Sequence, residues 1–334
     1  MLKISQEPRA AVMNTRKLGY TDLHFSTVGL GTWAIGGGDW KFGWGPQDDA
    51  ESIGAIRRAL ELGVNWIDTA HVYGFGHSEE IVGKAIRELK QKPIVATKCG
   101  RLSDNAGGVR ASIKKESIRQ ECEGSLKRLQ VERIDLYQIH WCEPDAELEE
   151  GWATMAELVK EGKIRFAGVC NASLAHLKRM QPIHPVASLQ PPYSMLVRDI
   201  EKETLAYCAA NDIGVVCYSP MQKGLLTGTF TRERIGALAP NDHRRNDPRF
   251  KEPQLSANLE LVEALRPIAA TYGKSVAHLA IAWTLRRPEV TSAIVGARRA
   301  SQIEQTAAAT DLKLPQADID AIEALLLKRQ QSIF

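Results

Sequence analysis

Short apolar runs alternate with amphipathic segments along most of the chain. Eight runs have the length and the Gly, Pro or Asp boundaries of strands buried on both faces. They lie near residues 28–31, 64–68, 94–98, 134–139, 164–169, 186–190, 213–217 and 292–295. Apolar residues at helical spacing predict helices between them, near 49–62, 78–89, 115–129, 147–161, 173–180, 199–211, 257–272 and 300–308. This alternation predicts an α/β fold, a single (β/α)8 TIM barrel.

Further segments lie outside the eightfold repeat. Helical patterns near 276–286 and 316–329 predict extra C-terminal helices. A turn at residues 19–22, flanked by short apolar stretches, predicts an N-terminal β-hairpin before the barrel. Residues 1–14 show no periodicity and contain a second methionine, so we expect a disordered extension or a misplaced start, and a barrel domain over 15–334. Capping patterns at Asp48 with Glu51 and at Ser301 with Glu304 predict two helix starts.

The composition and charge of the chain indicate which kind of ligand it binds. The chain has 334 residues, 44% of them hydrophobic, and its 43 basic and 40 acidic residues leave a net charge of only +3. Without a long basic run there is no electrostatic case for nucleic acid or an anionic membrane, so a small-molecule ligand is expected. The sequence contains no apolar run of membrane-spanning length and no signal-peptide pattern, and its six cysteines are scattered, which together predict a cytoplasmic enzyme with reduced thiols and no metal site.

Titratable residues stand at or just after the ends of three predicted strands. Asp68 ends the second strand and Tyr73 follows in the next loop, whereas Lys98 ends the third strand and His140 follows the fourth. The carboxyl ends of parallel strands converge on one face of a barrel, where catalytic groups are normally found. Each residue alone has a structural explanation, but the four together predict one catalytic site.

A dinucleotide-binding fold is the main alternative. Residues 29–34 match the glycine fingerprint of a doubly wound sheet. That fingerprint should open a helix at once, yet here it leads into a glycine-rich loop over residues 36–45. No tyrosine has a lysine four residues later, which disfavours the short-chain dehydrogenases.

Several segments together resemble the aldo-keto reductases. They are Asp-Thr-Ala-x-x-Tyr-Gly at residues 68–74, Ser-Glu-Glu-x-x-Gly at 78–83, Ala-Thr-Lys at 96–98 and Asp-Leu-Tyr-Gln-Ile-His at 135–140. Residues 190–193, 245–250 and 272–276 are similar to the bacterial general-stress-protein branch. The resemblance implies NADP(H)-dependent reduction of an aldehyde or ketone, with Tyr73 as proton donor assisted by Lys98, Asp68 and His140.

Carbonyl reduction explains why these four residue types would act together. A free phenol titrates near ~10, so a neighbouring cation is needed to favour the phenolate. Lys98 can supply this charge, with Asp68 fixing the ammonium and His140 orienting the substrate oxygen.

The resemblance also implies the cofactor contacts. Asn171 and Gln190 would hold the carboxamide, Tyr218 would stack on the nicotinamide, residues 219–225 would cover the pyrophosphate, and Arg298, with Arg299, would receive the 2′-phosphate of NADP(H). The full expected set is Gly31, Thr32, Trp33, Asp68, Cys170, Asn171, Gln190, Tyr218, Ser219, Pro220, Met221, Gln222, Lys223, Gly224, Leu225, Gly296, Arg298, Gln302 and Gln305. Four loop tryptophans, Trp33, Trp40, Trp44 and Trp141, predict an aromatic substrate pocket.

Some positions depart from the family pattern. Cys170 stands where serine is usual and Ala172 where an aromatic residue is common, so the carboxamide contacts would differ. Val295, Gln305 and Thr306 replace a usual proline, glutamate and asparagine, so the adenine contacts would differ from those of the family. The alternative function is a noncatalytic nicotinamide-binding subunit of the potassium-channel β type, which shares this fold.

Overall fold

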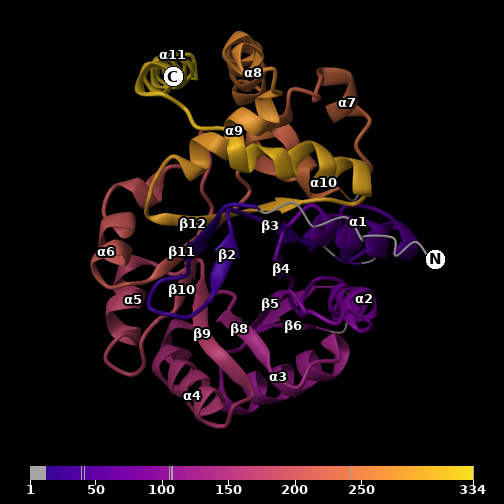
Figure 1. Ribbon diagram of the computed structural model, residues 1–334, viewed down its shortest axis with the longest axis vertical. Coiled ribbons are helices and arrows are strands. Elements are labelled where there is room, and N and C mark those ends of the chain that lie inside the picture. Colours follow the sequence, from indigo (N-terminus) through magenta and orange to yellow (C-terminus); the bar gives the residue numbers. More distant parts are fainter. Residues whose placement is uncertain are drawn as a thin grey trace, which may run out of the picture.

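A closed barrel of parallel strands forms the centre of the molecule (Figure 1). The computed structural model describes residues 13–38, 40, 42–104, 106, 108–240 and 242–333. Within these residues, eight strands pair in the cyclic order β10-β11-β12-β3-β4-β5-β8-β9. They are β3 (Val28–Gly31), β4 (Trp66–Asp68), β5 (Ile94–Cys99), β8 (Ile134–Ile139), β9 (Ile164–Cys170), β10 (Ser188–Gln190), β11 (Gly214–Tyr218) and β12 (Val290–Gly296). The predicted (β/α)8 barrel is therefore confirmed.

Helices surround the barrel because each presents an apolar stripe to it. In α1 (Asp49–Glu61), Ser52, Ala55, Ile56 and Ala59 are buried at helical spacing, and Asp48 caps the helix by accepting the Glu51 N–H at 2.8 Å. The other helices of this layer are α2 (His77–Ile86), α3 (Lys115–Leu129), α4 (Leu148–Lys160), α5 (Leu174–Met180), α6 (Thr204–Ala210) and α10 (Ala300–Ala307).

The N-terminal hairpin closes the amino-terminal end of the barrel. Strands β1 (Thr15–Lys17) and β2 (His24–Ser26) pair antiparallel, and Phe25 stacks on Trp66 with ring centroids 4.4 Å apart. Trp66 fills the barrel interior so tightly that a Cβ on Gly29 would lie 2.1 Å from its ring. Glycine at this position is therefore explained by packing inside a barrel strand, not by a dinucleotide fingerprint.

Side chains alternate in direction along each strand, and this alternation points polar residues into the barrel at its carboxyl end. Trp66 and Ala96 belong to the inner core, and two residues further along the same strands come Asp68 and Lys98. The same step of two leads from Leu136 in β8 to Gln138 and then to His140 just beyond the strand. Barrel geometry thus brings the predicted polar residues to one end.

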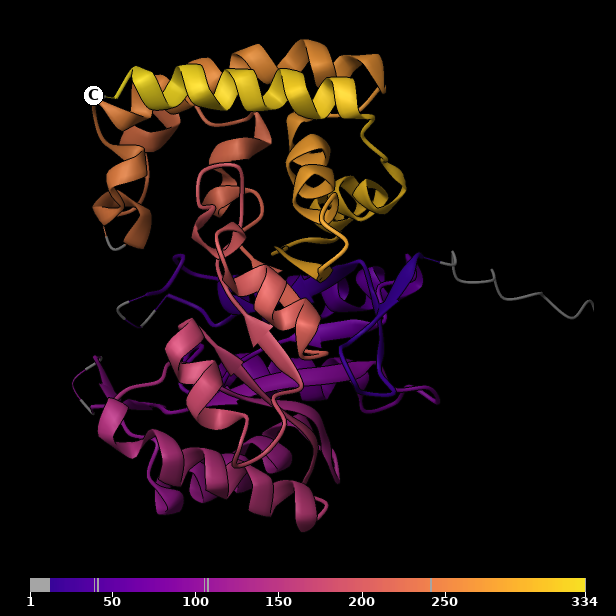
Figure 2. The same cartoon turned by 90° about the vertical axis from the view of Figure 1, so that its left-hand side faces the viewer.

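The additional C-terminal helices form a second layer at one side. Helix α9 (Val276–Leu285) is buried except at His278, because it lies against β12 and against α8 (Gln254–Thr271). Helices α8 and α11 (Gln316–Gln331) lie side by side beyond it (Figure 2). Both extra helical segments agree with the sequence pattern.

Several features differ from expectation. A second hairpin, β6 (Arg101–Ser103) with β7 (Val109–Ala111), and the short α7 (Arg232–Gly236) were not predicted. Helix α10 begins at Ala300, so Ser301 lies inside the helix and does not cap it. Of the predicted extension, residues 1–12 lie outside the described residues, but Met13 is buried in the core and the Asn14 carbonyl accepts the Thr27 N–H at 2.9 Å.

Candidate active site

The predicted catalytic residues meet at the carboxyl end of the barrel. The Lys98 ammonium donates to both carboxylate oxygens of Asp68, at 2.8 and 2.7 Å, and to the Thr69 carbonyl at 2.8 Å. It also lies 3.4 Å from the Tyr73 hydroxyl oxygen. The side chains of Lys98 and Asp68 are 0% and 4% exposed, so their charges are compensated almost entirely by each other.

His140 completes this cluster as a neutral imidazole. Its ring stands edge-on to that of Tyr73, with centroids 5.9 Å apart. Burial, followed by the charges of Lys98 and Arg101, lowers the pKa of His140 well below its ordinary value. A neutral imidazole can donate a hydrogen bond to a substrate oxygen without delivering a full proton.

The electrostatics of Tyr73 differ from the simple expectation that a lysine would favour its phenolate. Burial, followed by the Asp68 charge, raises the pKa of Tyr73 well above its ordinary value. The reason is that Asp68 neutralises the nearby ammonium while the protein excludes water. Tyr73 is therefore fully protonated at neutral pH, which suits an acid that gives up its proton only as negative charge develops on the substrate.

A chain of polar side chains connects the cluster to the next strands. Gln190 Nε2 donates to Asp68 Oδ1 at 2.8 Å, and Cys170 Sγ lies 3.6 Å from Gln190 Oε1. Asn171 Nδ2 contacts Cys170 Sγ at 3.1 Å, and Asn171 Oδ1 accepts the Tyr218 hydroxyl at 2.8 Å. The amides expected to hold a carboxamide are thus fixed beside the catalytic cluster, and the thiol lies between them.

One cavity of about 1460 Å³ runs from this cluster to the loops at the rim. Asp68, Tyr73, His140 and all four predicted tryptophans line it. Thr32, Lys98, Gln222 and Leu225 are buried behind its walls, where Thr32 donates to the Asp68 carbonyl and Gln222 accepts from Ser194. The expected cofactor residues that do line it are Gly31, Trp33, Asp68, Cys170, Asn171, Gln190, Tyr218, Ser219, Pro220, Met221, Lys223, Gly224, Gly296, Arg298, Gln302 and Gln305.

The loop over residues 219–225 is conformationally strained. Ser219, Gln222 and Lys223 have φ values of 56°, 47° and 56°, a left-handed region that such residues rarely adopt. Gly224 follows at 96°. The Lys223 ammonium is held by Asp247 at 2.9 Å. Strain of this kind is concentrated at ligand-binding loops in proteins.

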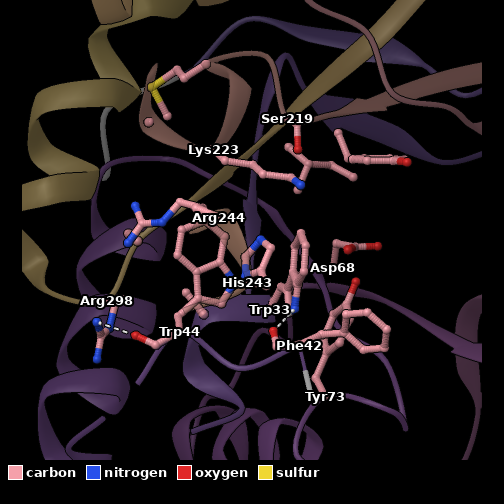
Figure 3. A pocket seen from close by; sticks show the side chains of 18 of the residues that line it. Trp33, Phe42, Trp44, Asp68, Tyr73, Ser219, Lys223, His243, Arg244 and Arg298 are labelled. Atoms are coloured by element: carbon pink, nitrogen blue, oxygen red, sulfur yellow. Dashed lines mark hydrogen bonds between the residues drawn. The ribbon is translucent and has the colours of Figure 1, made fainter. Parts of the chain in front are cut away.

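Arg298 is engaged within the protein. Its guanidinium donates to the Gln47 side chain and to the carbonyls of Trp44 and Pro46, so it ties residues 44–47 to the start of α10 (Figure 3). Arg299, next to it, is exposed. A phosphate ligand of Arg298 would therefore have to compete with these carbonyls.

Two loops that are far apart in sequence meet at the rim, and this contact was not predicted. His243 stacks on Trp33 and meets Trp44 edge-on, both with centroids 4.8 Å apart, and Arg244 lies 4.6 Å above the Trp44 ring (Figure 3). Burial lowers the pKa of His243 to about 4, so this imidazole is neutral near pH 7. The only hint in the sequence was the branch-specific segment 245–250 beside it.

The cavity residues fit a nicotinamide dinucleotide. Its inner end offers amides and the Tyr218 ring, and its middle offers Lys223 and strained loop backbone. Its outer end offers arginines beside the N-terminus of α10, where an anion is favoured. At the rim, the buried Trp44 Nε1 and His243 Nε2 have no hydrogen-bond partner in the described part of the chain.

Barrel, cluster and cavity together define a nicotinamide-type oxidoreductase site on a (β/α)8 scaffold. The model of the aldo/keto reductase family matches residues 27–327, and the chain belongs to this family. Its members are oxidoreductases that act on carbonyls. Among the described residues, no helix is long and apolar enough to cross a membrane, and no group of three or more potential ligands is arranged to hold a metal ion.

Known proteins that resemble the chain over nearly its whole length include bacterial enzymes. It is 40% identical to the aldo-keto reductase YhdN of Bacillus subtilis, over 94% of both chains. It is 36% identical to the NADH-specific methylglyoxal reductase of Escherichia coli, over 90% of this chain and 94% of that one. The structure of the glycerol dehydrogenase AKR11B4 from Gluconobacter oxydans matches with a TM-score of 0.86, 37% identity and coverage of 94% and 95%.

Proposed function

We propose that the protein reduces aldehydes or ketones to alcohols with NADPH, and that Tyr73 donates the proton. The observation that supports this most directly is the buried contact of Lys98 with both Asp68 and Tyr73, beside a cavity that His140 also lines. The bound nicotinamide would supply the hydride.

Proton delivery follows from the contacts of Tyr73. The substrate oxygen would lie between the Tyr73 hydroxyl and the His140 imidazole, which together bind the negative charge that develops on it. As the Tyr73 proton moves to that oxygen, the new phenolate is stabilised by the Lys98 ammonium 3.4 Å away. Asp68 keeps this ammonium in place, and in the reverse direction the Tyr73 phenolate would accept the proton of an alcohol.

NADPH is preferred over NADH because basic groups gather where a 2′-phosphate would lie. Arg298 and Arg299 line the cavity just before α10, whose N-terminus adds a favourable dipole. The relative from Escherichia coli is named as NADH-specific, so this preference needs its own test.

The aromatic rim supports a carbonyl substrate with an apolar or aromatic substituent. Trp33, Trp40 and Phe42 line the cavity near Tyr73. Trp141 also lines it, and the Arg101 guanidinium lies over the Trp141 ring, 5.4 Å from the ring centroid. Such walls bind planar or apolar groups without demanding one particular shape.

The test is a panel of carbonyls, including a nitrobenzaldehyde and methylglyoxal, assayed with NADPH and NADH separately. We expect absorbance loss at the nicotinamide band with NADPH and a higher kcat/KM for it than for NADH. A chain that binds NADPH tightly but turns over none of the carbonyls would instead be a nicotinamide-binding subunit without catalysis.

A further inference from the structure

Two buried carboxylates hold the catalytic strand on either side of Lys98. Glu79 in α2 accepts the Thr97 hydroxyl at 2.6 Å, one residue before Lys98. Glu121 in α3 accepts the Gly100 N–H with both oxygens, each at 3.1 Å, two residues after it. Both carboxylates are buried, with residue exposures of 0% and 4%. The helices outside the barrel thus fix the segment that carries the ammonium.

The two carboxylates differ in how their charge is compensated. Glu79 forms an ion pair with Arg128 at 2.7 Å, and Arg128 in turn contacts His71 Nδ1 at 3.0 Å. For Glu121 the described residues provide no ion pair, and its remaining contacts are the Ser117 hydroxyl at 3.2 Å and the Arg101 N–H.

In the described part of the chain, the titratable groups that interact electrostatically with Glu121 are Cys99 on β5, Tyr137 on β8 and Glu79 on α2, and none of these is a cation. Burial, with a smaller contribution from Glu79, raises the pKa of Glu121 to about 7 despite the hydrogen bonds it accepts. Its charge therefore changes in the neutral pH range.

Gly100 connects this carboxylate to the substrate side of the cavity. The residue has a φ of 89° and turns the chain from β5 into β6, which begins with Arg101. Arg101 lies over the Trp141 ring, donates to Glu143 at 2.7 Å and contributes to the lowered pKa of His140. A shift of Gly100 would move both Lys98 and one wall of the cavity.

We infer that Glu121 is a positioning residue whose ionised carboxylate holds residues 98–101 in the geometry needed for proton transfer, and whose protonation loosens that hold. Protonation removes the negative charge and turns one oxygen into a donor, so the contact of the two oxygens with the Gly100 N–H becomes weaker. The inference rests on the proposed reduction by Tyr73 and Lys98.

The test is the pH dependence of kcat for the wild type, Glu121→Gln and the control Glu123→Gln. Glu123 is exposed on the same helix and pairs with Lys163, away from β5. Tyr73 and His140 have pKa values well above and well below the neutral range, so neither accounts for a change near pH 7. Wild-type kcat should fall as the pH drops through about 7.

Glutamine has the shape of the protonated acid, so Glu121→Gln should keep a low kcat at every pH. We expect about a tenfold deficit above pH 7 and no inflection there, since small displacements of catalytic groups have effects of this size or larger. Glu123→Gln should reproduce the wild-type profile.

Thermal unfolding separates positioning from simple stabilisation. Because the pKa of Glu121 is raised in the folded state, ionising it destabilises the fold as the pH rises from about 4.5 through about 7. Glu121→Gln should therefore keep or raise Tm above pH 7 while kcat falls. If Glu121→Gln had a lower Tm but kept the inflection of kcat near pH 7, the positioning role of Glu121 would be wrong and the proposed function would stand. If the wild type turned over no carbonyl at all, both would be wrong.

Discussion

The centre and the rim of the cavity are built in different ways. At the centre, Asp68 and Lys98 project from adjacent barrel strands, and the pairing of these strands fixes their separation. At the rim, Trp44 from the first loop meets His243 edge-on and lies under the Arg244 guanidinium from the second loop. The comparison shows a chemical centre fixed by the barrel itself, and a ligand entrance that depends on contacts between two loops.

The largest effect is expected from Lys98→Met, which removes the ion pair between Lys98 and Asp68 at the centre. Removing the ammonium leaves the buried Asp68 carboxylate without its partner, which should lower the free energy of unfolding by about 3–5 kcal/mol. Turnover should fall by roughly 100-fold or more because the developing Tyr73 phenolate loses its stabilising charge. Urea denaturation and kcat measure the two effects, with the exposed Lys127→Met as control. Stability equal to that of the control would mean that the ion pair does not support the centre.

At the rim, Arg298→Ala should act on cofactor choice while leaving the centre intact. Loss of a charge-assisted hydrogen bond to a 2′-phosphate should weaken NADPH binding by about 1.5–3 kcal/mol and hardly affect NADH. Fluorescence titration of both cofactors measures this, with the neighbouring Arg299→Ala for comparison. If NADPH and NADH weakened equally, Arg298 would instead serve to hold the carbonyls of Trp44 and Pro46.

Cys170→Ser should have the smallest effect and tests the boundary between the two regions. The thiol is 1% exposed, lines the cavity and contacts Gln190 and Asn171. A hydroxyl is the stronger hydrogen-bonding group, so NADPH affinity should increase by at most about 0.5–1.5 kcal/mol. Affinity and Tm should be measured together, since a lower Tm with unchanged affinity would assign Cys170 to the barrel core.

The arrangement of the centre could be predicted from the sequence, whereas the contacts between the rim loops could not, for physical reasons. Strand periodicity and parallel pairing dictate that Asp68, Lys98 and His140 converge, so a pattern along the chain is enough. The contact of Trp44 with His243 joins irregular loops, and no periodic pattern encodes it. The same holds for Lys223, whose partner Asp247 could not be read from spacing.

The electrostatic environment of the buried groups could also not be predicted from the sequence. Lys98 beside Tyr73 indicated a phenol poised to ionise, but the pKa of Tyr73 is raised because burial and Asp68 act against that ammonium. Glu121 gave no sign of its role for a related reason. The sequence around Glu121 is typical of an amphipathic helix, and the contact of Glu121 with Gly100 arises only in the folded structure.

The most direct test of the proposed function is a single-turnover measurement of NADPH oxidation by the wild type and by Tyr73→Phe with the same aldehyde. Phenylalanine keeps the ring packing at the centre but removes the proton that the substrate oxygen needs. We expect the hydride-transfer step of Tyr73→Phe to be at least ~100-fold slower, with NADPH affinity and Tm nearly unchanged. A near-normal rate for Tyr73→Phe would contradict the assignment of Tyr73 as proton donor.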